Sequence, residues 1–416
     1  MDTKKIANNI LNAKYIGEHW FPHEFYTELR NQPTLTWLEP DNIDPFWAIV
    51  KHADITEIST QPDKFLSKPR PFVQTRAMEK WVNSNPVRTL LNMDPPEHRD
   101  YRKVVNPWFV PRNIRKLEDR MRRSAVELVD MMAESGTWAG DFVFDIAAIH
   151  PVRLITHLLG LPDEDEGYLI KLANETFGSE DKEFGRGGDG ISGLMESFRD
   201  AIVYFGKLMR DRRANPTEDL ASVICNAKIN GELLPPMGVY GYLIVILTAG
   251  HETTRTAMSG GMNALLQNPD EIRKLQENPD LMDSAIEEMI RWASPVSQFG
   301  RTAVEDYEIR GVTIKAGESV CQFYGAANRD EEVFEDPFSF RIDRDPNPHL
   351  GFGIGEHFCL GASLARLEMK VFFDEFIRRA DVDSIVPTGD VQYMASNFVG
   401  GVKHLPMQCR IVKKAA

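Results

Sequence analysis

The residues best suited to chemistry lie near the C-terminus, in the stretch FGIGEHFCLG, which ends in a predicted amphipathic helix. Gly353, Gly355 and Gly361 allow tight turns and a close approach of the backbone to a flat partner. Cys359 sits where the dipole and the free N–H groups of that helix favour a thiolate. Such a thiolate can be a nucleophile or the axial ligand of a haem iron.

The haem interpretation explains more of this stretch than the nucleophile does. A catalytic cysteine needs a nearby histidine and an orienting acid, and beyond His357 nothing in the sequence resembles a cysteine hydrolase. The other cysteines, Cys225, Cys321 and Cys409, form no CxxC pair and no zinc pattern. We expect each of these three to be a small buried hydrophobic residue.

A second group with chemical potential lies in the longest predicted helix, which runs from after Pro236 to before Pro269, about 31 residues. Its middle, AGHETT, places polar groups where a core helix normally carries leucines, and buried polar groups cost free energy unless they are used. Thr253 can bond back to a carbonyl one turn earlier. Alternatively, beside Glu252, the helix widens locally and makes room for dioxygen and water.

The remaining elements give a mainly α-helical chain with small β-sheets, of the α+β class. Residues 35–50 and 307–320 read as β-hairpins. Residues 69–92 read as a long irregular loop, a common form of lid or binding wall, and the charged, glycine-rich residues 178–190 as a flexible connection. Helical periodicity predicts further helices at roughly 97–134, 150–160, 164–177, 191–213 and 217–229.

Composition limits the possible functions. A formal net charge of −14 argues against a nucleic-acid partner, which needs a basic surface. No apolar run suits a signal peptide or a membrane anchor, so we expect a soluble, cytoplasmic protein with no membrane partner. With 416 residues and 42% hydrophobic side chains, one large domain over 1–416 can enclose a cofactor.

The cysteine stretch resembles the cysteine loop of the cytochrome P450 family. The matching positions are Phe352, Gly353, Gly355, His357, Cys359 and Gly361. Three more segments agree in order: AGHETT resembles the oxygen-activation motif, EEMIR the Glu-x-x-Arg pair at Glu288 and Arg291, and FRIDR supplies Arg344. The resemblance covers nearly the whole chain.

The resemblance implies a triangular fold with haem b buried between the long central helix and the cysteine-loop helix. It implies a monooxygenase with Cys359 as the iron ligand, Glu252 and Thr253 as the catalytic acid and alcohol, and Glu288, Arg291 and Arg344 as a structural cluster. The propionates are expected at His98, Arg102, Arg301 and His357. The full set of expected cofactor contacts is His98, Arg102, Ala249, Arg301, Phe352, Gly353, His357, Cys359 and Gly361.

The expected substrate pocket is largely apolar, which favours a small hydrophobic molecule. Its expected lining is Phe72, Val245, Ala249, Val296, Phe299, Phe398 and Val399. The pattern is most similar to bacterial members that hydroxylate monoterpenoids and aromatic hydrocarbons. Members that act on steroids share AGHETTR and ANRDEEVFEDP, so a steroid or other polycyclic terpenoid hydroxylase is the alternative.

The chain ends at Ala416 without a fused reductase, so the resemblance implies O2 and two electrons from a separate iron–sulfur ferredoxin, served by an NAD(P)H-dependent ferredoxin reductase. Three basic residues form either the surface that contacts the ferredoxin or an ordinary solvated helix face: Arg112, Arg115 and Lys116. Two other classes stay in view. The first is a peroxide-driven haem-thiolate enzyme, but such enzymes generally lack the acid/threonine pair that this chain has. The second is a non-catalytic haem module, which would have no use for an apolar pocket.

Overall fold

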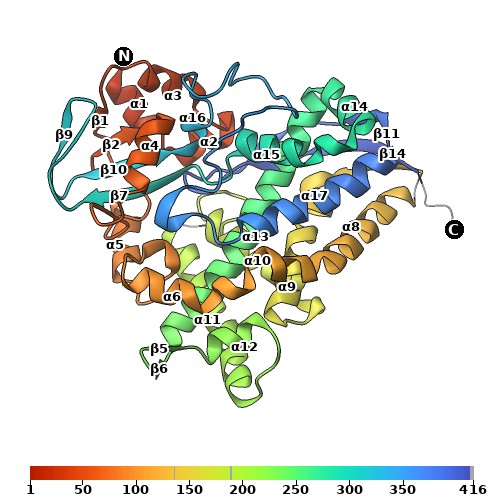
Figure 1. The fold of residues 1–416 in the computed structure, drawn as a ribbon, viewed down its shortest axis with the longest axis horizontal. Helices are drawn as coiled ribbons and strands as arrows, with labels where there is room; N and C mark the ends of the chain where they lie inside the picture. Colours follow the sequence, from red (N-terminus) through yellow and green to blue (C-terminus); the bar gives the residue numbers. More distant parts are fainter. Residues whose placement is uncertain (135, 188–189, 413–416) are drawn as a thin grey trace.

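The computed structural model describes residues 1–134, 136–187 and 190–412, and it has a roughly triangular outline (Figure 1). Helices dominate and the sheets are small, as predicted. The α-helices are α1 (Thr3–Asn9), α2 (Ala13–His19), α3 (His23–Arg30), α4 (His52–Ser59), α5 (Arg76–Ser84), α6 (Glu97–Val105), α7 (Pro111–Ile114), α8 (Glu118–Ala133), α9 (Ile149–Leu159), α10 (Glu166–Phe177), α11 (Ile191–Ala214), α12 (Leu220–Cys225), α13 (Pro236–Gln267), α14 (Pro269–Glu277), α15 (Met282–Ala293), α16 (Tyr324–Ala327) and α17 (Ala362–Arg379).

Short strands and turns of helix complete the chain. The strands are β1 (Thr36–Leu38), β2 (Phe46–Ile49), β3 (Phe65–Leu66), β4 (Thr137–Asp141), β5 (Lys228–Ile229), β6 (Glu232–Leu233), β7 (Gln298–Ala303), β8 (Tyr307–Ile309), β9 (Val312–Ile314), β10 (Ser319–Phe323), β11 (Ala380–Pro387), β12 (Gln392–Tyr393), β13 (Val402–His404) and β14 (Pro406–Ile411). The short 3-10 turns are η1 (Leu90–Asn92), η2 (Asn106–Trp108), η3 (Arg115–Leu117), η5 (Asp163–Asp165), η6 (Pro279–Leu281) and η7 (Gly355–His357), and η4 (Val143–Ala147) is a turn of π-helix.

The predicted long helix is α13, which spans 32 residues and runs through the middle of the molecule (Figure 1). It begins at Pro236, because proline suits the first turn of a helix, where its missing N–H has no partner to lose. Helices α9, α10, α11 and α15 pack around it, so most of its side chains are buried. Side chains in the middle of α13 that keep exposed surface therefore face an internal space.

The main sheet has the strand order β1-β2-β10-β7-β3. The predicted hairpin at 35–50 is the antiparallel pair β1 and β2. The second predicted hairpin is correct only in its first part, because β8 pairs with β9 while β10 joins the main sheet between β2 and β7. Strand β10 is buried along its whole length, which a hairpin at the surface would not allow.

Three expectations about the helices need correction. The predicted helix at 97–134 is broken into α6, α7 and α8, because Pro107 and Pro111 lack the N–H that a helix interior needs. The predicted helix at 217–229 is shorter, since α12 ends at Cys225 and β5 follows. The predicted loop at 69–92 contains α5, where the Thr75 side chain accepts a hydrogen bond from the N–H of Met78 and caps the helix.

The connection between α10 and α11 is packed rather than loose in its described part, and residues 188–189 lie outside that part. Asp181 and Phe184 are buried. The Asp181 carboxylate accepts a hydrogen bond from the N–H of Ala395 at 3.0 Å and pairs with Lys403 Nζ at 3.2 Å. These partners lie more than 200 residues away in sequence, so local patterning could not reveal them.

A histidine ties this connection to the C-terminal strands. His404 Nδ1 lies 2.6 Å from Asp141 Oδ2, and its Nε2 lies 2.9 Å from Glu183 Oε2. Burial opposes a charge on His404, but the hydrogen bonds to Glu183 and Asp141 outweigh it and raise the pKa of the ring. A charged His404 therefore bridges two acidic side chains from different segments, with Lys403 beside Glu183.

This bridge predicts a pH dependence of stability. Because the folded pKa lies above the ordinary 6.5, the stabilisation is complete below that value and is lost as the pH rises through the raised pKa. The half-buried bridge contributes about 1 kcal/mol or less. We expect the wild type to have a higher Tm than His404→Gln below pH 6.5, and we expect this difference in Tm to disappear as the pH rises through the raised pKa of His404. A pH-independent difference, or the same loss in exposed His19→Gln, would contradict the assignment.

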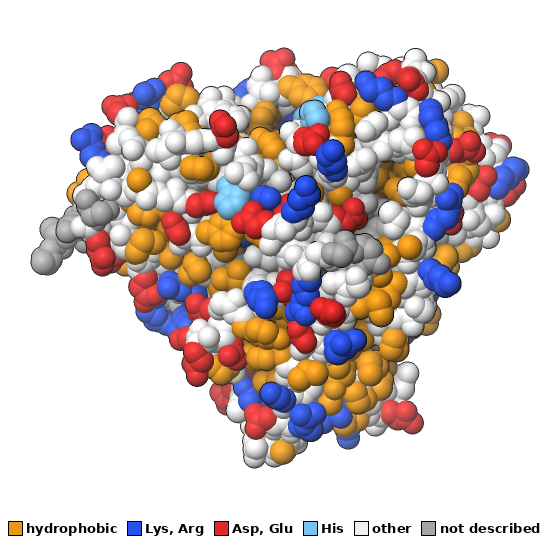
Figure 2. Space-filling view, turned by 180° about the vertical axis from the view of Figure 1, so that it is seen from behind, with side chains coloured by type: hydrophobic (Ala, Val, Ile, Leu, Met, Phe, Trp, Pro, Cys, Tyr) orange, Lys and Arg blue, Asp and Glu red, His pale blue; other side chains and the backbone are white. Residues whose placement is uncertain are grey.

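The surface carries charges of both signs. On the face opposite to that of Figure 1, charged side chains are scattered over the upper part and apolar ones gather in the lower part (Figure 2). In the part of the chain that the structure describes, none of the helices has the length and apolar character needed to cross a bilayer.

Candidate active site

The cysteine loop is held by two glycines in the left-handed region. Gly353 has φ +66° and Gly355 has φ +77°, and a Cβ on Gly355 would lie 2.2 Å from the carbonyl oxygen of Ser59. Other residues would therefore push the loop off the end of α4. Gly361 has an ordinary φ of −86°, so its value lies instead in its N–H, which hydrogen-bonds to the Cys359 thiol.

Cys359 differs from the other cysteines. Cys225, Cys321 and Cys409 are buried as predicted, whereas Cys359 is exposed. Yet burial raises the pKa of its thiol, against the opposing effects of the Gly361 N–H and of Arg102. Both observations hold together if the thiol faces a hollow inside the protein. Coordination to a metal cation would reverse the effect of burial, since it deprotonates a thiol.

Helix α13 presents one stripe of partly exposed side chains. Val245, Ala249 and Thr253 keep exposed surface, although Leu247 and Glu252 beside them are buried. A spacing of four residues places the three on one face of the helix. Because α13 is enclosed by other helices, this face lines an internal hollow. The structure thus places Val245 and Ala249, which the sequence predicted to line the pocket, on one helix face with Thr253, which it predicted to be catalytic.

Helix α6 and the cysteine loop lie beside each other. Arg102 donates to the carbonyl oxygen of Phe358 at 2.7 Å and to that of Glu356 at 3.3 Å. His98 Nδ1 lies 3.2 Å from the Glu356 carboxylate, and the rings of His98 and His357 have centroids 4.3 Å apart. The donors of Arg102 are thus engaged by the backbone of the cysteine loop, a positioning contact that the sequence did not predict.

Arg301 is a buried cation without a counter-ion. It lies on β7, and its hydrogen bond to the Gly300 carbonyl oxygen at 2.6 Å is to a neutral group. No ion pair joins it to any described residue. Burial, then the charges of Arg301, His98 and Arg102, lower the pKa of His357 to about 2. His357 is therefore neutral, and Arg301 remains a buried charge that favours an anion, because an unpaired buried charge is costly.

These observations fit haem b. A thiol faces a hollow, cations without acidic partners are gathered near it, and the α13 stripe offers the small side chain of Ala249. The carbonyl of Phe352 accepts the N–H of Cys359 at 2.9 Å, which fixes the ligand's backbone. The guanidinium groups of Arg301, which is buried, and Arg102, which is partly buried, suit carboxylates, and the thiol suits iron.

Of the two geometries that the sequence allows for the alcohol of α13, the structure shows the back-bonded one. The helix is not widened locally, and the Thr253 hydroxyl donates to the Ala249 carbonyl at 2.6 Å. Glu252 is fully buried and does not reach the surface. Its Oε1 accepts a hydrogen bond from Arg255, and its Oε2, 3.8 Å from His251 Nδ1, accepts no hydrogen bond from any described residue.

Arg255 explains how Glu252 can be buried. It lies one turn later on α13, the i,i+3 spacing that favours an ion pair, and this spacing was the signal in the sequence that could have found it. The guanidinium lies over the Phe184 ring at 5.1 Å, which links α13 to the packed connection. His251, buried beside the pair, has a pKa lowered to about 3 by burial and by Arg255, so it stays neutral.

Aromatic rings form an apolar wall. The ring of Phe398 lies 4.7 Å from that of Phe72, 5.4 Å from Phe299 and 5.9 Å from Phe177, measured between centroids. Residues Val296 and Val399 pair in an isolated β-bridge beside it. The residues of this wall were predicted from the sequence, with the exception of Phe177. Helical periodicity placed Phe177 at the end of a helix and gave no sign that its ring faces the wall.

The Glu288 cluster is buried. Arg291 donates to both carboxylate oxygens of Glu288 at 2.7 Å, and Arg344 Nε lies 3.1 Å from Oε2. Both arginines also donate to backbone carbonyls, including that of Asn328. The cluster joins α15 to residues 328–344, which lead into the cysteine loop.

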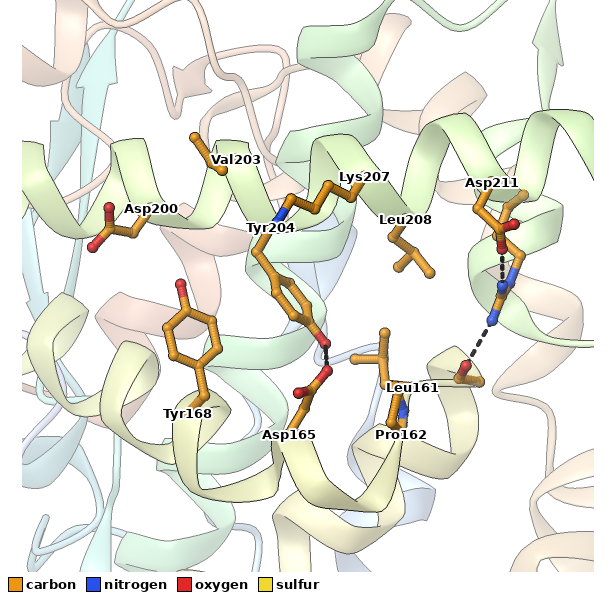
Figure 3. A pocket seen from close by; sticks show the side chains of 12 residues that line it. Leu161, Pro162, Asp165, Tyr168, Asp200, Val203, Tyr204, Lys207, Leu208 and Asp211 are labelled. Carbon is orange, nitrogen blue, oxygen red and sulfur yellow. Dashed lines mark hydrogen bonds and ion pairs between the residues drawn. The ribbon is translucent and has the colours of Figure 1, made fainter.

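A separate recess of about 700 Å³ lies between the start of α10 and helix α11 (Figure 3). The rings of Tyr168 and Tyr204 are 5.3 Å apart, and the Tyr204 hydroxyl donates to Asp165 at 2.6 Å. None of the site residues predicted from the sequence lines this recess. The recess therefore lies apart from the site that the sequence predicts.

Comparisons with known proteins agree with this geometry. The family model described as Cytochrome P450 matches residues 189–397. The chain is 35% identical to "Cytochrome P450-terp" of a Pseudomonas species, over 97% of both chains. It is 38% identical to "Steroid C26-monooxygenase" of Mycolicibacterium smegmatis, over 92% of this chain and 89% of the relative. The crystal structure of CYP108D1 from Novosphingobium aromaticivorans has a TM-score of 0.88 and 33% identity over 98% of both chains.

Proposed function

Since this chain belongs to the cytochrome P450 family of haem b monooxygenases, we propose that it hydroxylates a small hydrophobic molecule, a monoterpenoid or an aromatic hydrocarbon. The observation that carries the proposal is the apolar wall of Phe72, Phe299 and Phe398. It offers a substrate few hydrogen-bonding groups. The similarity to a relative named P450-terp supports the terpenoid part, and one domain formed by residues 1–416 supplies the whole site.

Haem b, when bound, activates dioxygen for insertion of one oxygen atom into a C–H bond. Cys359 would ligate the iron, and His98, Arg102, Arg301 and His357 would surround the propionates. The haem ring would contact three residues of the cysteine loop, Phe352, Gly353 and Gly361. It would also contact the small side chain of Ala249 on α13. Glu288, Arg291 and Arg344 would hold the scaffold.

The α13 pair would manage protons. Because the Ala249 carbonyl accepts the Thr253 proton, the lone pairs of Thr253 Oγ1 are free to accept a hydrogen bond within the hollow. Glu252 pairs with Arg255 through Oε1, and its Oε2 accepts no hydrogen bond from the described residues, so this oxygen is the one at which a proton would be received. Proton transfer by a positioned side chain contributes typically about 10²- to 10⁴-fold to a rate.

Thr253→Ala is therefore expected to keep haem and substrate binding but to lose coupling. Product per electron pair should fall about tenfold or more, with the missing electrons recovered as hydrogen peroxide, because the hydroxyl that orders protons is gone. The measurement compares NAD(P)H consumed, product formed and peroxide released. Thr253→Ser, which keeps a hydroxyl, is the control. A tightly coupled Thr253→Ala enzyme would refute the role.

Members of the family use redox partners, and we propose a ferredoxin with its NAD(P)H-dependent reductase. Arg112, Arg115 and Lys116 are exposed on α7 and η3, next to α17. A basic surface on an acidic protein suits an acidic iron–sulfur partner. Replacing all three with glutamine is expected to raise the KM for ferredoxin severalfold at low salt, with little change at high salt. An unchanged KM would move the docking surface elsewhere.

The substrate proposal is tested by titrating the purified holoenzyme with monoterpenes, bicyclic aromatic hydrocarbons and steroids while recording the Soret band. A spin-state shift with the first two groups supports the proposal. A shift confined to steroids favours the second candidate, a steroid or polycyclic terpenoid hydroxylase, which the likeness to a steroid C26-monooxygenase supports. No shift with any group refutes the apolar pocket. Turnover with hydrogen peroxide alone would favour a peroxide-driven enzyme.

A further inference from the structure

Three neighbouring side chains of α13 each have a buried polar atom without a hydrogen bond. His251, Glu252 and Arg255 are at most 2% exposed. Within residues 1–134, 136–187 and 190–412, no hydrogen-bond partner reaches His251 Nδ1, Glu252 Oε2 or Arg255 Nε. Buried polar atoms are nearly always bonded in folded proteins, so three exceptions in one cluster point to a second arrangement of these side chains.

The chemical state of His251 follows from its other ring nitrogen. Nε2 lies 3.0 Å from the carbonyl oxygen of Ala148, the residue that follows the π-helical turn η4, and a carbonyl oxygen can only accept. Nε2 therefore carries the ring proton. Burial, and then the charge of Arg255, lower the pKa of the ring to about 3, so His251 stays neutral. Its Nδ1 therefore presents a lone pair.

This lone pair lies next to the unpaired oxygen of Glu252. Nδ1 is 3.8 Å from Oε2, which is too far for a hydrogen bond. While the carboxylate is ionised, both atoms are acceptors, and a closer approach would bring two lone pairs together. A proton on Oε2 reverses this relation, because a hydroxyl group donates and Nδ1 accepts. The gap can then close to a hydrogen bond.

The two oxygens of Glu252 thus have neighbours of opposite kinds. Arg255 donates to Oε1, which suits a carbonyl oxygen, and His251 places an acceptor beside Oε2, which suits a hydroxyl. A carboxylic acid has one oxygen of each kind, whereas a carboxylate has two acceptors. The cluster therefore accommodates the protonated acid as well as the ionised form that pairs with Arg255.

We propose that His251 is a positioning residue for proton delivery, whose Nδ1 accepts a hydrogen bond from the protonated Oε2 of Glu252. The inference rests on the proposed role of Glu252 and deepens it. Glu252 takes up a proton brought by water, and the new O–H bond points at His251. The proton later leaves towards the hollow, and the carboxylate returns to its ion pair with Arg255. His251 keeps its own proton on Nε2 throughout.

Two substitutions separate this role from packing. His251→Gln has an amide nitrogen that can donate to Ala148, but it has no acceptor beside Oε2. We expect product per electron pair to fall about two- to tenfold, the weight of one hydrogen bond, and the solvent deuterium isotope effect on hydroxylation to rise because the proton step becomes slower. His251→Asn places its amide oxygen near the position of Nδ1 and loses the bond to Ala148. It should lower the Tm and keep most of the coupling.

His150→Gln is the matched control. His150 is also buried and neutral, with a pKa lowered to about 4 chiefly by burial. Its Nε2 lies 3.3 Å from the Glu368 carbonyl oxygen, and its Nδ1 is 3.0 Å from the Ser124 hydroxyl. This variant should match the wild type in coupling and in isotope effect. If it uncouples the enzyme as much as His251→Gln does, the loss of a buried ring explains both results and the role of His251 is refuted.

A measurement without substrate or turnover tests the hydrogen bond itself. The holoenzyme is labelled with ¹⁵N-histidine and held as the diamagnetic reduced carbonyl complex, and the Nδ1 signal of His251 is assigned by its loss in His251→Gln. Glu252→Gln mimics the protonated acid, because its amide can accept from Arg255 and donate to His251. We expect the Nδ1 signal to move upfield in Glu252→Gln, as for an imine nitrogen that gains a hydrogen bond. An unchanged signal would overturn the proposal.

The outcomes distinguish this inference from the proposed function. If Thr253→Ala uncouples hydroxylation and His251→Gln leaves it coupled, the role of His251 is refuted while the proposed function stands. If none of the terpenoid, aromatic or steroid compounds is hydroxylated, the proposed function fails. The Nδ1 signal then still decides whether His251 accepts a hydrogen bond from residue 252.

Discussion

Cys359→Ser is expected to abolish the thiolate-type absorption band of the reduced carbonyl complex and to lower hydroxylation more than about 100-fold. Even the loss of a hydrogen bond to a metal ligand costs about 10- to 100-fold in activity or metal affinity, and here the ligand itself is replaced. A serine hydroxyl does not ionise where the thiol does, and it lacks the soft sulfur that donates electron density to iron. The hydrogen bond from the Gly361 N–H, which now stabilises sulfur, would meet a neutral oxygen.

The control for this substitution is Cys225→Ala. Cys225 is buried in the core as the last residue of α12, so its loss should leave the carbonyl spectrum and the rate unchanged apart from a modest fall in stability. Haem content is measured in both proteins, because a Cys359→Ser protein with full haem and an altered band isolates the ligand effect. An unchanged thiolate-type band in Cys359→Ser would refute the assignment of Cys359.

Glu288→Ala should be the most destabilising substitution away from the cysteine loop, with a loss of about 3–5 kcal/mol in the free energy of unfolding. The carboxylate is fully buried and neutralises Arg291 and Arg344, both of which are buried as well. Its removal leaves two buried cations whose only remaining bonds are to neutral groups such as the Asn328 carbonyl. The measurement is chemical denaturation of the holoenzyme, or the fraction of soluble protein if the variant fails to fold.

Asp283→Ala provides the matched control, because Asp283 lies on the same helix and pairs with Lys370 at 2.6 Å, but its side chain is 78% exposed. An exposed pair contributes about 1 kcal/mol or less. Glu288→Gln adds a milder variant that keeps the shape and removes the charge. Equal losses for Asp283→Ala and Glu288→Ala would show that the cluster has no special structural weight.

The elements that could be predicted from the sequence are those whose signals are local. Pro236 and Pro269 bound the long helix, and its period and length follow from the residues between them. The glycine pattern before Cys359 anticipates a tight turn, which two positive φ angles confirm. The i,i+3 spacing of Glu288 and Arg291 anticipates their ion pair, although burial of that pair depends on Arg344, far away in sequence.

What the sequence could not predict depends on distant partners. Asp181 and Phe184 lie in a charged, glycine-rich segment that looked loose, and they are fixed by residues near 395 and 255. Helix α5 was missed because it is short and lies in a segment rich in Pro, Asn and Arg, and a cap at Thr75 sets its start. The back-bonded Thr253 was one of two geometries that the sequence allowed, and the intact α13 selects it.

The unpaired charge of Arg301 has a consequence for the maturation of the enzyme. Folding must bury this cation, and the free energy spent on it is recovered only when an anionic cofactor arrives. Binding and folding are then thermodynamically linked, and a ligand at a thousand times its dissociation constant stabilises the native state by about 4.1 kcal/mol. The supply of haem in the cell therefore governs how much of this polypeptide survives as native protein as well as how much of it is active.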